Sequence, residues 1–234
     1  MIVEKLTWDS QFFKKEIGKI VVDYVDMAFY QEINHFIVSS PFDLIYIFEK
    51  NVEYEHNPIV NKTLKDTKVL YQKTAHSSRI DVTSCKRYSD SVIKNINDLY
   101  SLAIASGAYS RYRIDPKFSK KNFEDLYTKW VDNSLNKTIA DDVFIYEEHG
   151  NIIGFITVKY IEEKTEIGLI AVKDSYRGKK IGSSLLNTVE CETIKRGKSY
   201  ISVATQLSNL SACRFYEKNE YEIENKVNIY HIWK

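Results

Sequence analysis

A short glycine-containing stretch lies where a predicted strand gives way to a predicted helix. Residues 166–172 are apolar and β-branched, as in a buried strand. Farther along, Ile181, Leu185 and Val189 recur every four residues, which predicts one apolar face of a helix that Gly197 can close in the left-handed conformation. The segment is therefore predicted to be a strand, a loop and a helix.

The loop itself, Arg177-Gly-Lys-Lys-Ile-Gly-Ser183, has the composition of an anion cradle. Backbone N–H groups at the start of a helix lack intrahelical partners and carry partial positive charge. Gly178 and Gly182 remove side chains where a phosphate must come close. A P-loop is excluded because Ser183 follows Gly182 directly, so no lysine stands where that motif needs one. We predict that the loop binds a pyrophosphate.

The loop resembles the acetyl-coenzyme A (acetyl-CoA) loop of the GNAT N-acetyltransferases, with the pattern Arg/Gln-x-x-Gly-x-Gly/Ala. Arg177 and Gly182 match the ends of the pattern, and Lys180 replaces its usual glycine. The resemblance implies that acetyl-CoA is the co-substrate and that backbone groups of the preceding strand contact its pantetheine arm. The implied cofactor-binding residues are Leu169, Ile170, Ala171, Val172, Arg177, Gly178, Lys179, Lys180, Ile181, Gly182 and Ser183.

A second block, residues 209–221, resembles the family pattern Asn-x-x-Ala-x-x-Phe-Tyr-Glu-Lys-x-Gly-Phe. The matching residues are Asn209, Ala212, Phe215, Tyr216, Glu217 and Lys218. Glu220 replaces the glycine, and we expect Asn219 to adopt the left-handed conformation and end the helix one residue early.

The resemblance also implies catalytic roles. Tyr216 would donate a proton to the departing thiolate, and a phenol near pKa 10 is a close match to a thiol near 8.5. Glu166 would be the general base that neutralises the amine, and Asn209 would fix the cofactor or the helix entrance. Two alternatives stay open: Glu166 as a solvated strand-edge carboxylate, and Asn209 as a simple helix cap.

Weaker signatures resemble one branch of the family, the TDP-fucosamine acetyltransferases (dTDP-4-amino-4,6-dideoxygalactose N-acetyltransferases). They are Leu6-Thr-Trp8 with Phe12-Phe13, Ser110-Arg-Tyr112, and Val203-Ala-Thr-Gln206. The branch implies a nucleotide-linked amino sugar as acceptor. Arg111, Tyr112 and Arg113 are then the candidate substrate-binding residues, because guanidinium groups bind phosphate in a bidentate way. The alternative is that these arginines are ordinary loop charges.

Composition limits the function classes. The 234 residues carry a net charge of +1, which favours neither a nucleic-acid nor a membrane partner. The longest clean apolar run, residues 44–48, is far too short to span a bilayer, and we expect no signal peptide. Three separated cysteines form no metal-ligand spacing and suggest a reducing compartment, so we expect a cytoplasmic location. The five scattered histidines have no ligand spacing either.

The order of predicted elements indicates an α/β protein. We expect residues 1–76 to form a small N-terminal α/β supporting domain and residues 77–234 a GNAT domain, with a central mixed β-sheet flanked by helices. Expected details include a loop or irregular hairpin over 51–61, a helix capped by Ser89 or Asp90 with Val92 on its buried side, and a loop over 106–118. Ser119 should cap the next helix, and two strands, 221–223 and 226–232, should finish the sheet.

The resemblance therefore implies an N-acetyltransferase that moves acetyl from acetyl-CoA to a dTDP-4-amino-4,6-dideoxyhexose by direct attack in a ternary complex. The sequence predicts no metal, no nucleic acid and no membrane partner, and a homodimer through the C-terminal strands as a family-level expectation. Two alternatives stay open. One is acetylation of another small amine or a peptide, and the other is a non-catalytic acyl-CoA-binding protein.

Overall fold

The computed structural model describes residues 2–52, 58–76 and 85–234. Contacts between Cα atoms divide the chain into two compact units. The first contains residues 1–69, 205–210 and 224–234, and the second contains residues 70–204 and 211–223. The expected boundary at residue 76 borders the segment 77–84, which lies outside the described residues. Most of the last strand belongs to the same unit as the N-terminal residues.

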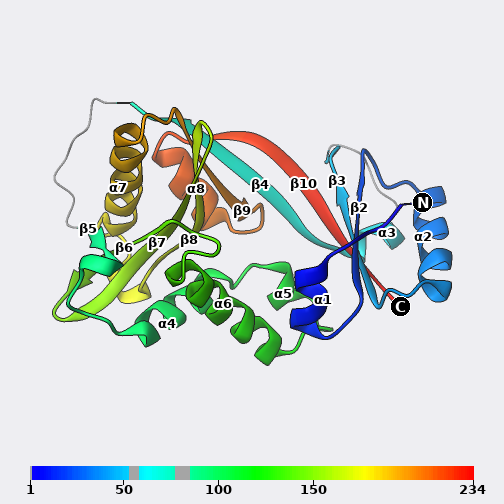
Figure 1. Cartoon of the computed structure of the whole chain (residues 1–234). Coiled ribbons are helices and arrows are strands. Elements are labelled where there is room, and N and C mark those ends of the chain that lie inside the picture. The colour runs from blue at the N-terminus through cyan, green and yellow to red at the C-terminus, as the bar shows by residue number, and fades with distance from the viewer. Residues whose placement is uncertain (1, 53–57, 77–84) are drawn as a thin grey trace. The chain divides into compact units, whose positions relative to one another are not determined.

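The first unit is a small sheet with helices (Figure 1). Its strand order is β1-β2-β3-β10-β4. β2 pairs with β3 in parallel, whereas β1 with β2 and β3 with β10 are antiparallel. The strands are β1 (Glu4–Lys5), β2 (Ile17–Val22), β3 (Leu44–Glu49), β4 (Leu64–Thr74) and β10 (Glu222–Trp233), and the helices are α1 (Thr7–Phe13), α2 (Met27–Ser39) and α3 (Pro58–Asn61).

The core of this unit is mainly apolar and also encloses the carboxylate of Glu49. Ile33 and Ile37 of α2 pack with Ile45 and Ile47 of β3 in one apolar cluster. Glu49, at the end of β3, is fully buried, and its oxygens accept hydrogen bonds from the side chains of Asn228 and Tyr230 and from the backbone of Val25. Because a buried carboxylate needs such donors, this network ties β10 to β3.

The second unit has the strand order β4-β9-β8-β7-β6-β5. β5 to β8 form an antiparallel series, and β9 is parallel to β8, which it reaches through a helical crossover. The strands new to this unit are β5 (Cys85–Arg87), β6 (Asp142–Glu148), β7 (Asn151–Ile161), β8 (Lys164–Val172) and β9 (Tyr200–Gln206), and its helices are α4 (Ile96–Ser106), α5 (Arg111–Ile114), α6 (Lys120–Leu135), α7 (Ile181–Lys195) and α8 (Leu210–Lys218).

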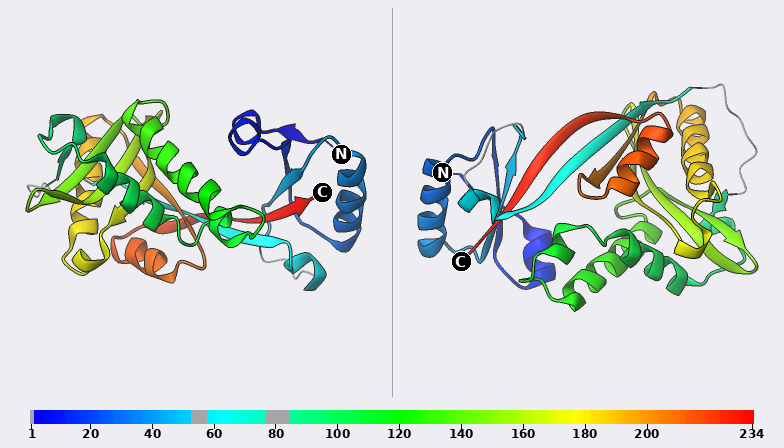
Figure 2. Two further views of the ribbon diagram at one scale, coloured as in Figure 1. Left: turned by 90° about the horizontal axis from the view of Figure 1, so that it is seen from below. Right: turned by 180° about the vertical axis from the view of Figure 1, so that it is seen from behind.

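Helices flank this mixed sheet (Figure 2), which confirms the predicted α/β class. α7 packs on β6, β7 and β8, and α4 packs on β7, β8 and α6. Ile181, Leu185 and Val189 are buried, as the spacing predicted. Gly197 follows α7 at φ +67°, and Ser119 caps α6 by accepting a hydrogen bond from the backbone of Asn122, so both predicted helix ends are confirmed.

Four local expectations were wrong. Residues 58–61 form the short helix α3, and residues 111–114 form the short helix α5, where loops were expected. α4 begins only at Ile96, and Val92 is 92% exposed, because Tyr88–Asp90 form a separate 3-10 turn before it. β10 is continuous through residues 224–225, since pairing within the sheet overrides the polar composition that suggested a turn.

Candidate active site

The two central strands of the second unit separate halfway along their length. β8 and β9 pair in parallel from Lys164 opposite Tyr200 to Ile167 opposite Val203, where the ladder ends. β8 continues to Val172 and stays paired on its other side with β7. Along an antiparallel pair, alternate residues direct their backbone groups away from the partner strand. The stretch from Leu169 to Val172 therefore offers backbone hydrogen-bonding groups on the side that β9 has left.

The predicted anion loop follows this open stretch and leads into α7. Residues 177–180 are exposed, and α7 begins at Ile181. The first helical hydrogen bond of this end is donated by the Ser184 N–H to the Lys180 carbonyl. The N–H groups of residues 181–183 therefore precede the helical ladder and are available to an anion. Nearby, the Arg177 guanidinium pairs with Asp174 at 2.7 Å, and the Lys179 ammonium lies 4.5 Å from the Tyr176 ring centroid.

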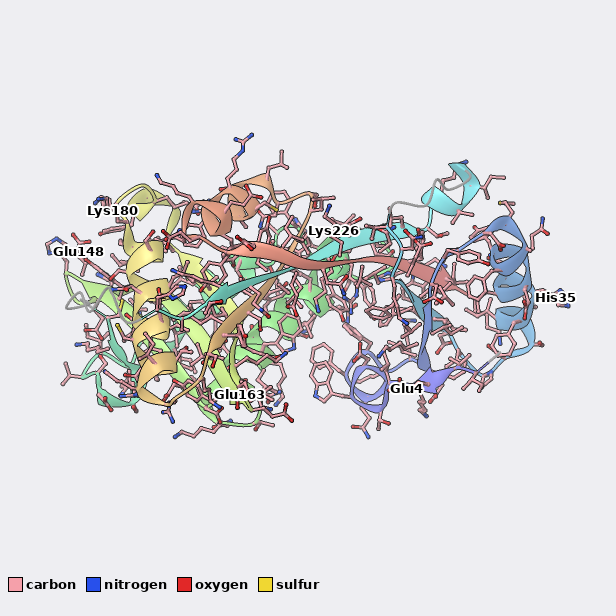
Figure 3. All side chains as sticks on the ribbon, turned by 90° about the horizontal axis from the view of Figure 1, so that it is seen from above. Glu4, His35, Glu148, Glu163, Lys180 and Lys226 are labelled. Carbon is pink, nitrogen blue, oxygen red and sulfur yellow. The ribbon has the colours of Figure 1, made fainter. Side chains whose placement is uncertain are left out.

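The departure of Lys180 from the family glycine has a structural cost. Lys180 stands immediately before α7 (Figure 3) with φ +61° and ψ 10°, in the left-handed region. This conformation costs a side-chain-bearing residue about 1–2 kcal/mol, which glycine avoids. Lysine therefore adds charge to the predicted anion loop at the expense of backbone strain.

Lys180→Gly is expected to stabilise the folded protein by about 0.5–1 kcal/mol, because the strain removed exceeds the entropy that glycine adds to the unfolded chain. Urea unfolding measures the change. Lys179→Gly is the matched control, since it removes the neighbouring lysine, whose φ is not positive. Equal effects of the two substitutions would contradict the strain assigned to Lys180.

The two sequence blocks meet through a glycine. A Cβ added at Gly182 would lie 3.0 Å from two ring carbons of Phe215, so the start of α7 packs directly on an aromatic residue of α8. Gly178 differs, because its φ of +81° favours glycine while its Cβ position is open among the described residues. Backbone conformation thus explains the glycine at residue 178. At residue 182, packing on Phe215 is a reason for glycine in addition to the predicted approach of a phosphate.

Tyr216 lies inside an aromatic cluster. Its side chain is 3% exposed, and its ring centroid lies 5.5 Å from that of Tyr71 and 5.9 Å from that of Tyr221. The Tyr71 hydroxyl donates a hydrogen bond of 2.9 Å to Glu217 on α8, which anchors the cluster to this helix. The cluster holds the Tyr216 ring in one place.

Burial, with a smaller contribution from the nearby Cys213 thiol, raises the pKa of Tyr216 well above its ordinary value near 10. The close match of phenol and thiol pKa values expected from the sequence therefore does not hold in this structure. The phenol keeps its proton at neutral pH but is a weaker acid than a solvated tyrosine.

The helix that carries Tyr216 ends differently from the expectation. α8 ends at Lys218, and Glu220 adopts the left-handed conformation at φ +68°, whereas Asn219 does not. Glu220 occupies the position of the family glycine and has a positive φ. The left-handed residue is therefore set by the course of the chain rather than by the residue type that most readily adopts it.

Glu166 lies on β8 just before the strands separate. It stands opposite Lys159 of β7 and beside Ser202 of β9. Its carboxylate pairs with the Lys164 ammonium at 2.6 Å, and both side chains are about 40% exposed. The position fits either a base near the end of the ladder or a solvated ion pair, so its role stays a prediction.

The candidate acceptor residues lie on α5. The Arg111 guanidinium stacks 4.4 Å from the Tyr112 ring centroid and donates a 2.6 Å hydrogen bond to the hydroxyl of the same tyrosine. Tyr112 is buried against Phe118 and Trp130. Arg113 is exposed, with its guanidinium 5.7 Å from the Phe123 ring centroid. Tyr112 packs in the interior and accepts the Arg111 hydrogen bond, and its role in substrate binding stays a prediction.

Asn209 belongs to the first unit. Asn209 precedes α8, and its backbone N–H donates to the Gln206 carbonyl.

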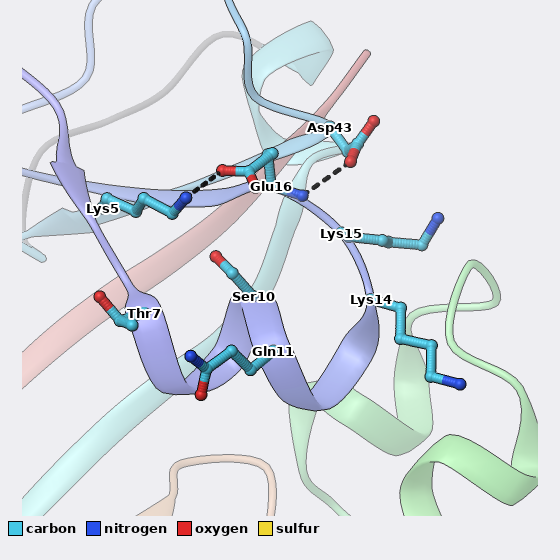
Figure 4. Close-up of a pocket in the computed structure, with 8 residues that line it drawn as sticks. All are labelled: Lys5, Thr7, Ser10, Gln11, Lys14, Lys15, Glu16 and Asp43. Carbon is cyan, nitrogen blue, oxygen red and sulfur yellow. Dashed lines mark hydrogen bonds and ion pairs between the residues drawn. The ribbon is translucent and has the colours of Figure 1, made fainter.

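The first unit also has a pocket beside α1, which is lined by eight residues, none of them a predicted site residue (Figure 4). There Lys5 pairs with Glu16 at 2.7 Å, and the Asp43 carboxylate accepts a hydrogen bond from the Glu16 backbone.

Thr157, Gly168 and Tyr71 were not singled out from the sequence. Each acts through a partner distant in the chain, such as Leu169 for Thr157 and Glu217 for Tyr71. Motifs of residues close in sequence contain no information about such pairs.

Within the described residues, no group of three histidine, cysteine, aspartate or glutamate side chains could hold a metal. None of the helices in the described part of the chain has the length and hydropathy of a membrane span.

The model of the acetyltransferase (GNAT) family matches residues 107–221. The chain is 31% identical over 133 residues to the spore coat polysaccharide biosynthesis protein SpsD of Bacillus subtilis, covering 56% of this chain and 45% of that protein. It is 28% identical over 133 residues to the dTDP-fucosamine acetyltransferase of Escherichia coli, covering 56% of each. The chain thus spans about half the length of these two relatives.

A further relative, the spermidine N(1)-acetyltransferase of Thermoplasma acidophilum, is 34% identical over 123 residues, which cover 52% of this chain and 73% of that protein. Among solved structures, a GCN5-related N-acetyltransferase from Sphaerobacter thermophilus superposes with a TM-score of 0.55 at 12% identity. The match covers 88% of this chain and 65% of that one. This likeness concerns the fold.

Proposed function

Because the chain belongs to the GNAT family of acetyltransferases, we propose that it moves acetyl from acetyl-CoA to the amine of a nucleotide-linked amino sugar. The acceptor would be of the dTDP-4-amino-4,6-dideoxyhexose type. The observation that carries the proposal is the separation of β8 from β9 beside the N-terminus of α7. That arrangement presents backbone groups for an extended pantetheine arm and N–H groups for a pyrophosphate.

The cofactor side of the site rests on these elements. In the proposal, the stretch Leu169–Val172 contacts the pantetheine arm through the backbone groups that face away from β7. Residues 177–183 hold the pyrophosphate, with Lys179 and Lys180 adding positive charge. Asn209 contributes at the entrance to α8. The aromatic cluster around Tyr216 meets this region through the contact of Phe215 with Gly182.

In the reaction, the neutral amine attacks the thioester carbonyl, a C–N bond forms, and the C–S bond breaks. The amine loses one proton, which Glu166 accepts directly or through water. The departing thiolate gains one proton, which Tyr216 donates. Burial raises the pKa of Tyr216, so the phenol is protonated when the thiolate leaves.

The choice of acceptor is supported by charge and by the relatives. Arg111 and Arg113 of α5 supply guanidinium groups suited to a diphosphate, and their positive charge disfavours a polyamine. The match to the dTDP-fucosamine acetyltransferase covers 133 residues. The similarity to a spermidine N(1)-acetyltransferase favours a second candidate, transfer to a polyamine amine.

The test is mass spectrometry after incubation with acetyl-CoA and a panel of amines. A nucleotide 4-amino sugar, the free amino sugar, spermidine and a peptide amine would each be offered. We expect a mass increase of one acetyl group only on the nucleotide sugar, with release of free thiol. Acetylation of spermidine alone would favour the second candidate. Tight CoA binding without thiol release on any amine would favour a non-catalytic binding protein.

A further inference from the structure

Thr157 lies in the middle of β7 and has a role beyond filling the core. Its side chain is 2% exposed. Its Oγ1 accepts a hydrogen bond of 2.9 Å from the Leu169 backbone N–H of the neighbouring strand β8. A side-chain acceptor for a backbone N–H in the interior of a sheet is unusual, because ladder carbonyls normally fill this role.

The reason is an irregularity in the pairing of the two strands. Ile156 stands opposite Ile170, but Val158 stands opposite Ile167. Gly168 and Leu169 of β8 therefore face the single residue Thr157 of β7, which is a β-bulge. The extra residue interrupts the ladder, so the Leu169 N–H has no ladder carbonyl opposite it. The Thr157 hydroxyl accepts the hydrogen bond of this N–H instead.

Gly168 completes the arrangement. A Cβ added there would lie 2.8 Å from Thr157 Oγ1, closer than real Cβ atoms come. The hydroxyl thus fills the space that a side chain at residue 168 would need. The Thr157 hydroxyl and the missing side chain of Gly168 are therefore complementary. The hydrogen bond from Leu169 to Thr157 fixes the residue that follows Gly168.

The bulge coincides with the point where β8 leaves β9. The parallel ladder ends at Ile167, one residue before Gly168. A bulge bends its strand and increases the local twist. The open stretch from Leu169 to Val172 begins at the bulge, so its direction depends on how the bulge is held.

We propose that Thr157 is a positioning residue: its hydroxyl holds the bulge of β8 and so directs Leu169–Val172 toward the pantetheine arm of CoA. The proposal rests on the proposed use of acetyl-CoA. Without the hydroxyl, the Leu169 amide is left buried without its acceptor, and β8 can shift toward regular pairing with β7. A binding edge that must be ordered on association binds its ligand more weakly.

The test is titration calorimetry of CoA with Thr157→Val, Thr157→Ser and the wild type. Valine keeps the shape and removes the oxygen, and we expect the Kd for CoA to rise about threefold to tenfold, as for the loss of one hydrogen bond. Serine keeps the hydroxyl and should restore an affinity close to that of the wild type. A Kd unchanged in Thr157→Val would overturn the proposal.

Thr165→Val is the matched control. Thr165 is also buried on β8, and its Oγ1 accepts a 2.8 Å hydrogen bond from Thr193 of α7, away from the bulge. This variant should lose stability without losing CoA affinity, so an equal loss of affinity in both variants would reduce Thr157 to a structural role. If Thr157→Val does not fold, Gly168→Ala replaces it, since its Cβ pushes on the same hydroxyl, and unchanged CoA affinity there would overturn the proposal.

The outcome is separable from that of the proposed function. If the wild type does not bind CoA, the proposed use of acetyl-CoA fails. If the wild type binds CoA and Thr157→Val binds it equally well, only the positioning role fails.

Discussion

Tyr216→Phe is expected to lower kcat about a hundredfold while leaving the affinity for CoA close to that of the wild type, since general acid catalysis commonly contributes this much. The substitution removes the phenol oxygen and keeps the ring that packs against Tyr71 and Tyr221. Turnover is measured by thiol release, and affinity by calorimetry. A kcat equal to that of the wild type would remove the proposed role of proton donor.

The pH profile gives a second readout for Tyr216. Burial raises its pKa above the ordinary value near 10, so the proton needed by the thiolate stays on the phenol throughout the neutral and mildly alkaline range. The rate should rise with pH as the acceptor amine loses its proton, and Tyr216 should cause no decline below about pH 10. A decline below that pH that disappears in Tyr216→Phe would contradict the raised pKa.

Tyr221→Phe is the matched control for this experiment. Tyr221 is equally buried in the same cluster, and burial raises its pKa in the same direction. Removing the Tyr221 hydroxyl tests whether the loss of a phenol oxygen anywhere in the cluster lowers turnover by disturbing the packing. We expect kcat close to that of the wild type, and a loss as large as that of Tyr216→Phe would assign the effect to the cluster rather than to one donor.

Local patterns identified those parts of the fold that depend on residues close in sequence. The fourfold spacing of Ile181, Leu185 and Val189 predicted the buried face of α7, and Ser119 predicted the start of α6. Helix periodicity and capping are decided within one or two turns of chain, so a single sequence contains the whole signal. The fold class followed from the order of such elements.

The errors came from features that distant residues decide. Residues 224–225 look like a turn but lie within β10. Glu220 is left-handed although Asn219 adopts that conformation more readily. In each case the path of the surrounding chain outweighs local propensity, and the sequence gives no sign of that path.

The candidate site shows the same division. The two motifs named the predicted anion loop and Tyr216, yet the bulge opposite Thr157 depends on register between strands, which no local pattern specifies. The pKa of Tyr216 likewise depends on burial, which the motif does not encode. Sequence reasoning therefore named residues, and the structure supplied their environments.

Gly182→Val is expected to weaken CoA binding about fivefold or more, because overpacking at a tight contact commonly costs about 1–3 kcal/mol and here displaces the first N–H groups of α7. Even a single Cβ would lie 3.0 Å from the Phe215 ring, and valine adds two methyl groups beyond it. Calorimetry with CoA measures the loss, and urea unfolding measures the accompanying destabilisation.

A second substitution separates packing from direct contact with the cofactor. Phe215→Leu makes room beside residue 182, so the double variant should recover most of the lost affinity, giving a clear coupling energy in a double-mutant cycle. Gly178→Val is the matched control, because its strain arises from φ +81° rather than from a neighbour, and Phe215→Leu should not rescue it. If Phe215→Leu fails to rescue Gly182→Val, the glycine is required by the ligand and not by the aromatic ring. The contact between the two motifs would then be incidental to binding.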